Sequence, residues 1–217
     1  MKLVWCPDMA SKAYIDTVKS CQNFKEPGVP ELLSAMAAGW NSKLIVETWS
    51  HGGPIATSVG LAVAASHTSG RHVCIVPDEQ SRSGYIQAMR ELAGISPMNV
   101  VVGDGGELVA AISGVDFLVV DSKCEDFASV LRRARLSDGG AVLACKNACN
   151  RRCSGFRWNW VLDRGTRVAR SVFLPVGKGL DIAHVDANGG DSIAKKGPGR
   201  WIRHIDQRSG EEHIFRV

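Results

Sequence analysis

Four acidic side chains stand at the ends of apolar, β-branched segments, where they could bind a polar ligand together. They are Glu47, Asp78, Asp104 and Asp121. A carboxylate can accept two short hydrogen bonds at once, and its charge strengthens both. Asp also forms turns for purely structural reasons, so a single acid at a strand end indicates little. Four acids in succession predict a shared ligand site.

Small and basic residues accompany these acids. Gly52 and Gly53 follow the first acidic strand end, and Gly105 follows the third. Glycine lets a backbone approach a ligand closely. Lys146 follows the last of these strands, where it could hold an anionic substrate or act as a base towards a hydroxyl. His51 is the other candidate base, although a surface histidine without a role explains it better.

Alternating strands and helices must position these residues. Two amphipathic helices are expected first, at 11–21 and 29–38. The expected strands are 43–48, 73–76, 99–102, 116–120 and 141–145, and the helices between them are 54–66, 81–92, 107–112 and 126–135. Such an alternation predicts right-handed crossovers and a parallel sheet covered on both faces. Ligands of these sheets bind at the carboxyl ends of the strands, where the four acids would meet.

The pattern changes after residue 145. A polar, basic loop at 146–165 precedes two expected strands, 167–175 and 180–187, joined by a glycine turn. A Gly- and Lys-rich loop follows, and then a possible last hairpin at 200–205 and 213–217. We therefore expect one α/β domain. Residues 1–187 would form a Rossmann-like unit with N-terminal helices, and residues 188–217 a C-terminal extension of the same domain.

Composition narrows the class of protein. The 217 residues suit one core, and no apolar run approaches the roughly 20 residues that span a bilayer. Seven cysteines without a secretory signal at the N-terminus favour reduced thiols, hence the cytoplasm, with the nucleus as an alternative. Residues 151–217 carry 13 Lys and Arg against 7 Asp and Glu. This charge could attract a nucleotide, a coenzyme A ester or nucleic acid. A solvated surface explains it better, so a nucleic-acid partner is not our leading interpretation.

Three segments resemble a known family of enzymes. The hairpin from Phe173 to Ile182 is similar to the closing hairpin of the caffeoyl-CoA and catechol type O-methyltransferases. The segment from Val115 to Asp121 resembles their fourth strand with its acidic end, and that from Ser137 to Leu143 resembles the entry to their fifth. The likeness covers about residues 27–187. Over the whole chain, the sequence resembles a plant family of methyltransferase-like proteins whose activity is not established.

The resemblance implies S-adenosylmethionine as the cofactor and a Rossmann-like class I methyltransferase fold. Glu47 with Gly52 and Gly53 would hold the methionine part, Asp78 the ribose, and Asp104 with Gly105 the adenine side. The family's first strand ends in Glu-x-Gly-x-x-x-Gly. This sequence keeps the acid and the second glycine but has Trp49 at the first. The indole would either swing outwards or fill the cofactor site.

The candidate catalytic residues would face the methyl acceptor. The resemblance implies Asp121, at the end of the fourth strand, whereas Lys146 and His51 are candidates from their residue types and positions. Metal-dependent members use an Asp-Asn pair after the fifth strand, whereas this chain has Lys146-Asn147. A lysine among metal ligands opposes cation binding, so we expect no metal. The expected reaction is O-methyl transfer to a small molecule that could be anionic. The alternatives are a non-catalytic binding or scaffold protein, and RNA binding through the basic tail. A homodimer is also consistent with the family.

Overall fold

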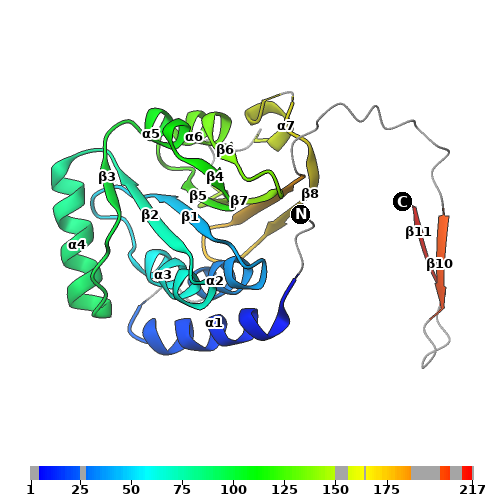
Figure 1. Cartoon of the computed structure of the whole chain (residues 1–217), viewed down its shortest axis with the longest axis horizontal. Coiled ribbons are helices and arrows are strands. Elements are labelled where there is room, and N and C mark those ends of the chain that lie inside the picture. Colours follow the sequence, from blue (N-terminus) through cyan, green and yellow to red (C-terminus); the bar gives the residue numbers. More distant parts are fainter. Residues whose placement is uncertain are drawn as a thin grey trace.

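The computed structural model describes residues 5–24, 28–149, 156–163 and 165–186, and the backbone of 201–205 and 212–216. Helices and strands alternate along most of the chain (Figure 1). The strands are β1 (Leu44–Thr48), β2 (Arg71–Val76), β3 (Val100–Val102), β4 (Ser113–Val115), β5 (Phe117–Asp121), β6 (Arg135–Leu136), β7 (Ala141–Lys146), β8 (Val168–Leu174), β9 (Leu180–Val185), β10 (Trp201–Ile205) and β11 (Glu212–Arg216). The helices are α1 (Pro7–Ser20), α2 (Val29–Gly39), α3 (Ala56–Thr68), α4 (Glu79–Ala93), α5 (Gly105–Ala111), α6 (Phe127–Arg133) and α7 (Trp158–Val161).

A seven-stranded sheet forms the centre, in the order β3-β2-β1-β5-β7-β9-β8. Strands β3, β2, β1, β5 and β7 are parallel, and β9 runs antiparallel to both β7 and β8. The carboxyl ends of the five parallel strands therefore meet at one edge. The expected α/β fold, with a mostly parallel sheet and a C-terminal antiparallel hairpin, is confirmed.

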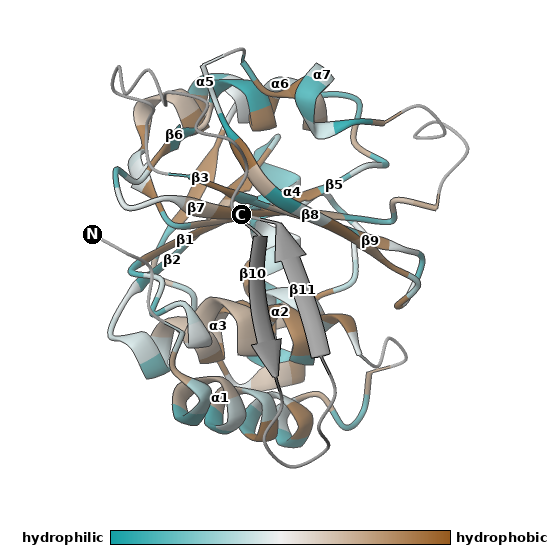
Figure 2. Ribbon diagram, turned by 90° about the vertical axis from the view of Figure 1, so that its right-hand side faces the viewer, coloured by the Kyte–Doolittle hydropathy of each residue, from teal (hydrophilic) through white to brown (hydrophobic). Residues whose placement is uncertain are grey.

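Helices cover both faces of the sheet. Figure 2 shows α1, α2 and α3 on one face and α5, α6 and α7 on the other. Side chains alternate between the faces along each strand. In β5, Phe117 and Val119 pack towards α2 and α3, whereas Leu118 and Val120 join the cluster under α5 and α6. A third apolar cluster joins α4 to α3 over β2.

Hydrogen bonds tie the start of β1 to the start of β5. The carboxylate of Asp116 accepts from the backbone N–H groups of Lys43 and Leu44, at 2.8 and 3.0 Å. The expected strand at 116–120 is therefore shifted by one residue in the structure, and Asp116 joins two strands instead of beginning one. Strands β4 and β6 were not expected from the sequence, and they form a separate two-stranded parallel sheet.

The C-terminal part also differs in detail from the expectation. The stretch at 146–165, expected to be an irregular loop, contains the short helix α7. Strands β10 and β11 lie within one residue of the expected final hairpin, and they pair with each other antiparallel. The expected loop at 188–199 lies outside the described residues. The division into a unit of residues 1–187 and an extension stays a prediction.

Candidate functional site

A cavity of about 510 Å³ opens at the carboxyl end of the parallel strands. Its volume is within the range of pockets that bind small molecules. Its walls are the loop after β1, the loop after β5, and the ends of β2 and β7; the lining residues are Thr48, Trp49, Ser50, His51, Gly52, Gly53, Pro54, Pro77, Asp121, Lys123, Cys124, Glu125, Asp126 and Lys146. The structure thus brings together the three predicted catalytic residues and two of the predicted glycines.

Asp121 is held in one orientation by two hydrogen bonds. Its Oδ1 accepts from the backbone N–H of Lys123 at 2.9 Å, and its Oδ2 accepts from Nδ2 of Asn147 at 2.7 Å. The hydroxyl of Ser122 donates to the carbonyl oxygen of Asn147 at 2.7 Å. The loops after β5 and β7 are therefore fastened together where they form the cavity wall, and the carboxylate is fixed before any ligand arrives.

Lys146 lies beside Asp121, because the two residues are partners in the parallel register of β5 and β7. Its side chain is only 6% exposed, yet it lines the cavity. Within the described part of the chain its ammonium forms no ion pair and no hydrogen bond, and the two oxygens of Asp121 accept from Lys123 and Asn147. A buried cation without a partner is unfavourable for stability.

His51 lies on the exposed side of the same cavity. Its ring packs against α4, where a Cβ added at Gly84 would come within 3.0 Å of Nδ1. Gly52 has a φ of +75°, in the left-handed region that favours glycine. Its backbone and the His51 ring both border the opening, within reach of a bound molecule.

Glu47 is buried and does not line the cavity. The Tyr85 hydroxyl donates to its Oε1 at 3.0 Å, and Nε2 of His72 lies 3.1 Å from the same oxygen. Burial alone would raise the pKa of Glu47. The hydrogen bond and charge of His72, with a smaller contribution from Lys146, outweigh burial and hold the pKa below its ordinary value of 4.5. These contacts make Glu47 part of the interior that joins β1, β2 and α4.

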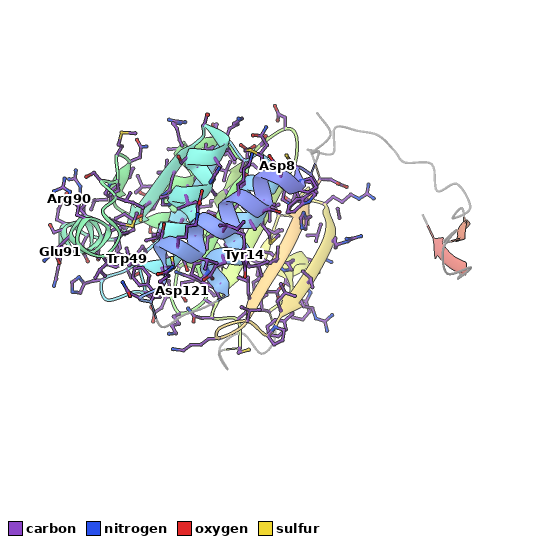
Figure 3. All side chains as sticks on the ribbon, turned by 90° about the horizontal axis from the view of Figure 1, so that it is seen from below. Asp8, Tyr14, Trp49, Arg90, Glu91 and Asp121 are labelled. Atoms are coloured by element: carbon purple, nitrogen blue, oxygen red, sulfur yellow. The ribbon has the colours of Figure 1, made fainter. Side chains whose placement is uncertain are left out.

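Trp49 is turned inwards, which answers the question that the sequence left open. It is 4% exposed and packs edge-on against Tyr85, with ring centroids 5.4 Å apart. A Cβ at Gly53 would lie 3.1 Å from the indole nitrogen, so this glycine makes room for the indole. Figure 3 shows where Trp49 and Asp121 lie on the fold. Because Trp49 lines the cavity, its indole forms part of the wall at the position where the resembled enzymes have a glycine.

Asp78 and Asp104 lie at the predicted edge but are engaged as helix caps. Oδ1 of Asp78 accepts from the backbone N–H of Ser81 at 2.7 Å, at the start of α4. This hydrogen bond lowers the pKa of Asp78. Asp104 caps α5 in the same way, by accepting from the N–H of Glu107 at 2.8 Å. Neither carboxylate lines the cavity.

Gly105 borders a smaller hollow next to the main cavity, of about 50 Å³, together with Gly103 and Trp49. A Cβ at Gly105 would approach Oδ2 of Asp126 to 2.8 Å, so close packing of α5 on the following loop accounts for this glycine. Of the four carboxylates that were predicted to surround one cavity, only that of Asp121 lines the main cavity. The ligand-binding roles of the other three stay predictions.

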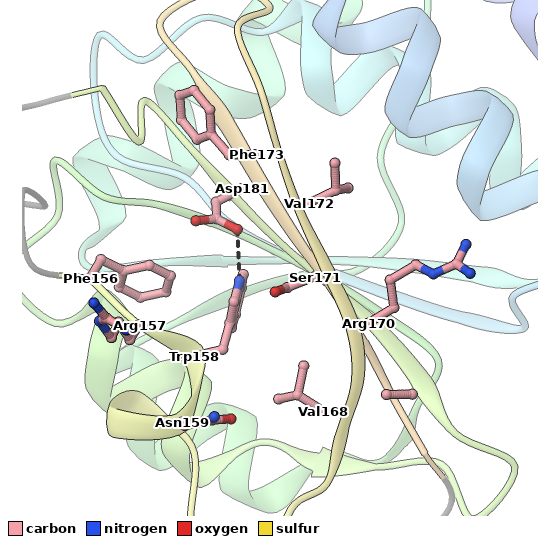
Figure 4. A pocket seen from close by; sticks show the side chains of 11 residues that line it. Phe156, Arg157, Trp158, Asn159, Val168, Arg170, Ser171, Val172, Phe173 and Asp181 are labelled. Carbon is pink, nitrogen blue, oxygen red and sulfur yellow. Dashed lines mark hydrogen bonds between the residues drawn. The ribbon is translucent and has the colours of Figure 1, made fainter. Parts of the chain in front are cut away.

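A second cavity, of about 460 Å³, lies between α7 and β8 (Figure 4). Its aromatic lining includes Trp158, whose indole N–H donates to Oδ1 of Asp181 at 2.7 Å. Arg157 and Arg170 also line it. This cavity was not expected from the sequence. The sequence shows only that aromatic residues stand among arginines in this region, whereas the Trp158–Asp181 contact joins residues that are far apart along the chain.

Two further features are absent from the described residues. Among the described residues, no group of three or more His, Cys, Asp and Glu side chains could hold a metal ion. No described helix is long and apolar enough to cross a membrane.

Solved structures with a similar fold include methyltransferases. A methyltransferase from Geobacter sulfurreducens is 21% identical, with a TM-score of 0.54 over 81% of this chain and 88% of that one. An S-adenosylhomocysteine-bound methyltransferase from Podospora anserina is 14% identical, with a TM-score of 0.55 over 85% and 89%. The O-methyltransferase TomG from Streptomyces achromogenes, in complex with S-adenosylmethionine, is 20% identical, with a TM-score of 0.51 over 81% and 90%. At this identity the likeness establishes the fold alone.

The chain thus has the Rossmann-like class I methyltransferase fold, with the cavity at the edge where ligands of parallel sheets bind. Over residues 1–217 it matches the family described as "Protein of unknown function (DUF1442)", and it belongs to that family. No curated protein matches the sequence.

Proposed function

We propose that the chain binds S-adenosylmethionine in the cavity beside β1 and transfers its methyl group to a hydroxyl of a small molecule. One observation carries the proposal. In a fold shared with methyltransferases, the cavity at the carboxyl edge brings together Asp121, Lys146 and His51, the three residues that the sequence predicted on the acceptor side.

The residues of the cavity fit such a ligand. Two buried polar atoms of its lining, Oγ1 of Thr48 and Nε1 of Trp49, have no hydrogen-bond partner within the described residues. Buried polar groups are nearly always satisfied, so these two are suited to a ligand that supplies polar atoms. Gly103 and Gly105 border the adjoining hollow, which leaves space beside the end of β3.

The binding residues follow from their positions. The backbone at Gly52 and Gly53 would face the methionine part. Asp78 would use the oxygen that does not cap α4 to accept from the ribose, and Asp104 with Gly105 would lie at the adenine side. Glu47 would act through β1 and not by contact, because its carboxylate is buried, does not line the cavity, and is contacted by Tyr85 and His72 at Oε1.

The chain's own groups could then assist methyl transfer. When bound, the cofactor supplies an electrophilic methyl group on a sulfonium. Asp121 and Asn147 would orient the acceptor, and positioning of this kind is a large part of catalysis. His51 at the opening would accept the proton of the acceptor hydroxyl.

Calorimetric titration of the protein with S-adenosylmethionine and S-adenosylhomocysteine tests the proposal. We expect both to bind and to raise the melting temperature. At a ligand concentration one hundred times the Kd, linkage predicts about 2.7 kcal/mol of added stability. Gly52→Trp, which would crowd the opening, should weaken binding, whereas Trp160→Ala at an exposed position should not. Absence of heat and of any melting shift would remove the proposal.

A non-catalytic binding or scaffold protein is the second candidate, and the inward indole of Trp49 favours it. The indole forms part of the wall at a position where the resembled enzymes have glycine, and Gly53 serves to accommodate it. This candidate predicts that no methyl group reaches any member of a panel of catechols, phenols and hydroxylated acids, even when the cofactor binds. Radiolabelled methyl transfer from S-adenosylmethionine distinguishes the two candidates.

A further inference from the structure

Lys146 is the one buried basic residue among the lining residues of the main cavity. The other charged lining residues are Asp121, which is half-buried, and Lys123, Glu125 and Asp126, which are exposed. A charge is most effective where water is excluded, so Lys146 dominates the electrostatics of the cavity interior, whereas the exposed carboxylates are screened by solvent.

No protein group in the described part of the chain forms an ion pair or a hydrogen bond with this ammonium. Asp121 directs its oxygens to the N–H of Lys123 and the amide of Asn147. Glu47 feels the charge of Lys146, but its hydrogen bonds go to Tyr85 and His72. A buried ammonium normally has a carboxylate partner, because leaving it unpaired costs several kcal/mol.

We infer that Lys146 is a carboxylate-binding residue, whose partner is the carboxylate of a bound ligand. The inference deepens the proposed function and rests on it for the identity of that ligand. Two sources could supply the carboxylate: the amino-acid end of the cofactor, or an acidic group of the methyl acceptor. In either case Lys146 determines specificity by rejecting the neutral counterpart, because binding that ligand would leave the buried cation unpaired.

The Lys146→Met substitution separates the two sources. It keeps the length of the side chain and removes its charge. S-adenosylhomocysteine has the carboxylate, whereas 5′-methylthioadenosine lacks it. If the cofactor supplies the carboxylate, calorimetry should show that the variant binds S-adenosylhomocysteine about 10- to 100-fold more weakly and 5′-methylthioadenosine with unchanged affinity.

The acceptor arm uses a matched pair of probes, 3,4-dihydroxybenzoate and its neutral amide. If the acceptor supplies the carboxylate, wild-type protein should prefer the acid about tenfold or more, and Lys146→Met should lose this preference while binding S-adenosylhomocysteine normally. Lys12→Met, an equal loss of charge on the exposed side of α1, should leave every affinity within about twofold.

Thermal unfolding distinguishes binding from a structural role. Because Lys146 lacks a partner in the protein, Lys146→Met should melt at or above the temperature of the wild type. If the variant melts well below the wild type and retains both affinities, the lysine is structural and the inference is wrong. If no adenosyl ligand binds wild-type protein, the proposed function fails. In that case the benzoate and its amide test the inference. It is supported if wild-type protein prefers the benzoate and Lys146→Met loses this preference, and it is wrong otherwise.

Discussion

The side chain of Trp49 is decisive at the residue scale, because a single substitution changes what the cavity edge can hold. The indole belongs to the apolar cluster of α3, α4 and β2, where Ile55 and Val59 pack around it. A glycine at position 49 would leave that cluster incomplete. The residue is therefore both a wall of the candidate site and a part of the core.

We expect Trp49→Gly to lower the free energy of unfolding by about 3–5 kcal/mol, the cost of truncating a large buried aromatic side chain. Urea unfolding followed by circular dichroism measures the change. Trp160→Ala is the matched control: this tryptophan is 70% exposed and contacts Arg157 through a cation–π interaction, so its loss should cost little. Equal costs for the two variants would contradict the inward position of Trp49.

Glu47 gives a prediction about pH. Burial, the largest single effect, raises its pKa in the folded protein, but the hydrogen bond and charge of His72 together with the charge of Lys146 outweigh burial, so the pKa is lowered. The folded state therefore binds fewer protons than the unfolded chain as the pH approaches the ordinary value of 4.5. The stabilisation by Glu47 is complete above that pH and is lost as the pH falls through the lowered pKa.

Glu47→Gln removes this titration. At neutral pH the variant should be about 1–2 kcal/mol less stable, since the hydrogen bonds lose their charge. The gap between wild type and variant should close as the pH falls below 4.5. Urea unfolding at a series of pH values measures both curves, and curves that stay parallel through this range would refute the assignment.

At the scale of elements, Asp78 has two roles that one pair of substitutions can separate. Asn keeps the cap of α4, because its side-chain oxygen can accept the Ser81 N–H, whereas Ala cannot. We expect Asp78→Ala to lower the melting temperature and Asp78→Asn to leave it nearly unchanged. If the carboxylate also binds the ribose, both variants should bind S-adenosylhomocysteine more weakly. Glu79→Gln, next to it on α4, is the control for the loss of charge.

The sequence predicted the order of these elements well, and the reason is local. Short β-branched runs between amphipathic segments indicate strands and helices without any tertiary information. The convergence of Asp121 and Lys146 followed, because parallel strands that end together place their last residues side by side. Asp78 and Asp104 also reached the predicted edge. Each precedes a helix, and that position is typical of an N-cap as well as of a ligand contact.

Other parts of the site depend on partners that are distant along the chain. Glu47 shares a face of β1 with Ile45, so alternation could have indicated that it points towards the interior. Its hydrogen bonds to His72 and Tyr85, however, needed the fold. The inward turn of Trp49 likewise depended on Tyr85. Strand periodicity gives the face of a residue but not the neighbours that occupy it.

At the scale of the whole molecule, the described apolar core ends with β9. The three buried clusters lie between Ala13 and Val185, and β10 pairs with β11 and not with the central sheet. The extension expected from the sequence, residues 188–217, follows β9 along the chain and carries part of the basic charge.

A chain that ends at residue 187 should accordingly unfold in one cooperative transition, with a melting temperature close to that of the full chain. It should also retain any affinity for S-adenosylhomocysteine, because the cavity lies wholly within residues 48–146. A chain that ends at residue 174 is the control. It lacks β9, which pairs with both β7 and β8 and contributes the buried Leu180, Ile182 and Ala183, and it should lose the cooperative transition. Calorimetric melting compares the three proteins. If the chain ending at residue 187 loses cooperativity as the shorter one does, the C-terminal segment is part of the folding unit and the core does not end at β9.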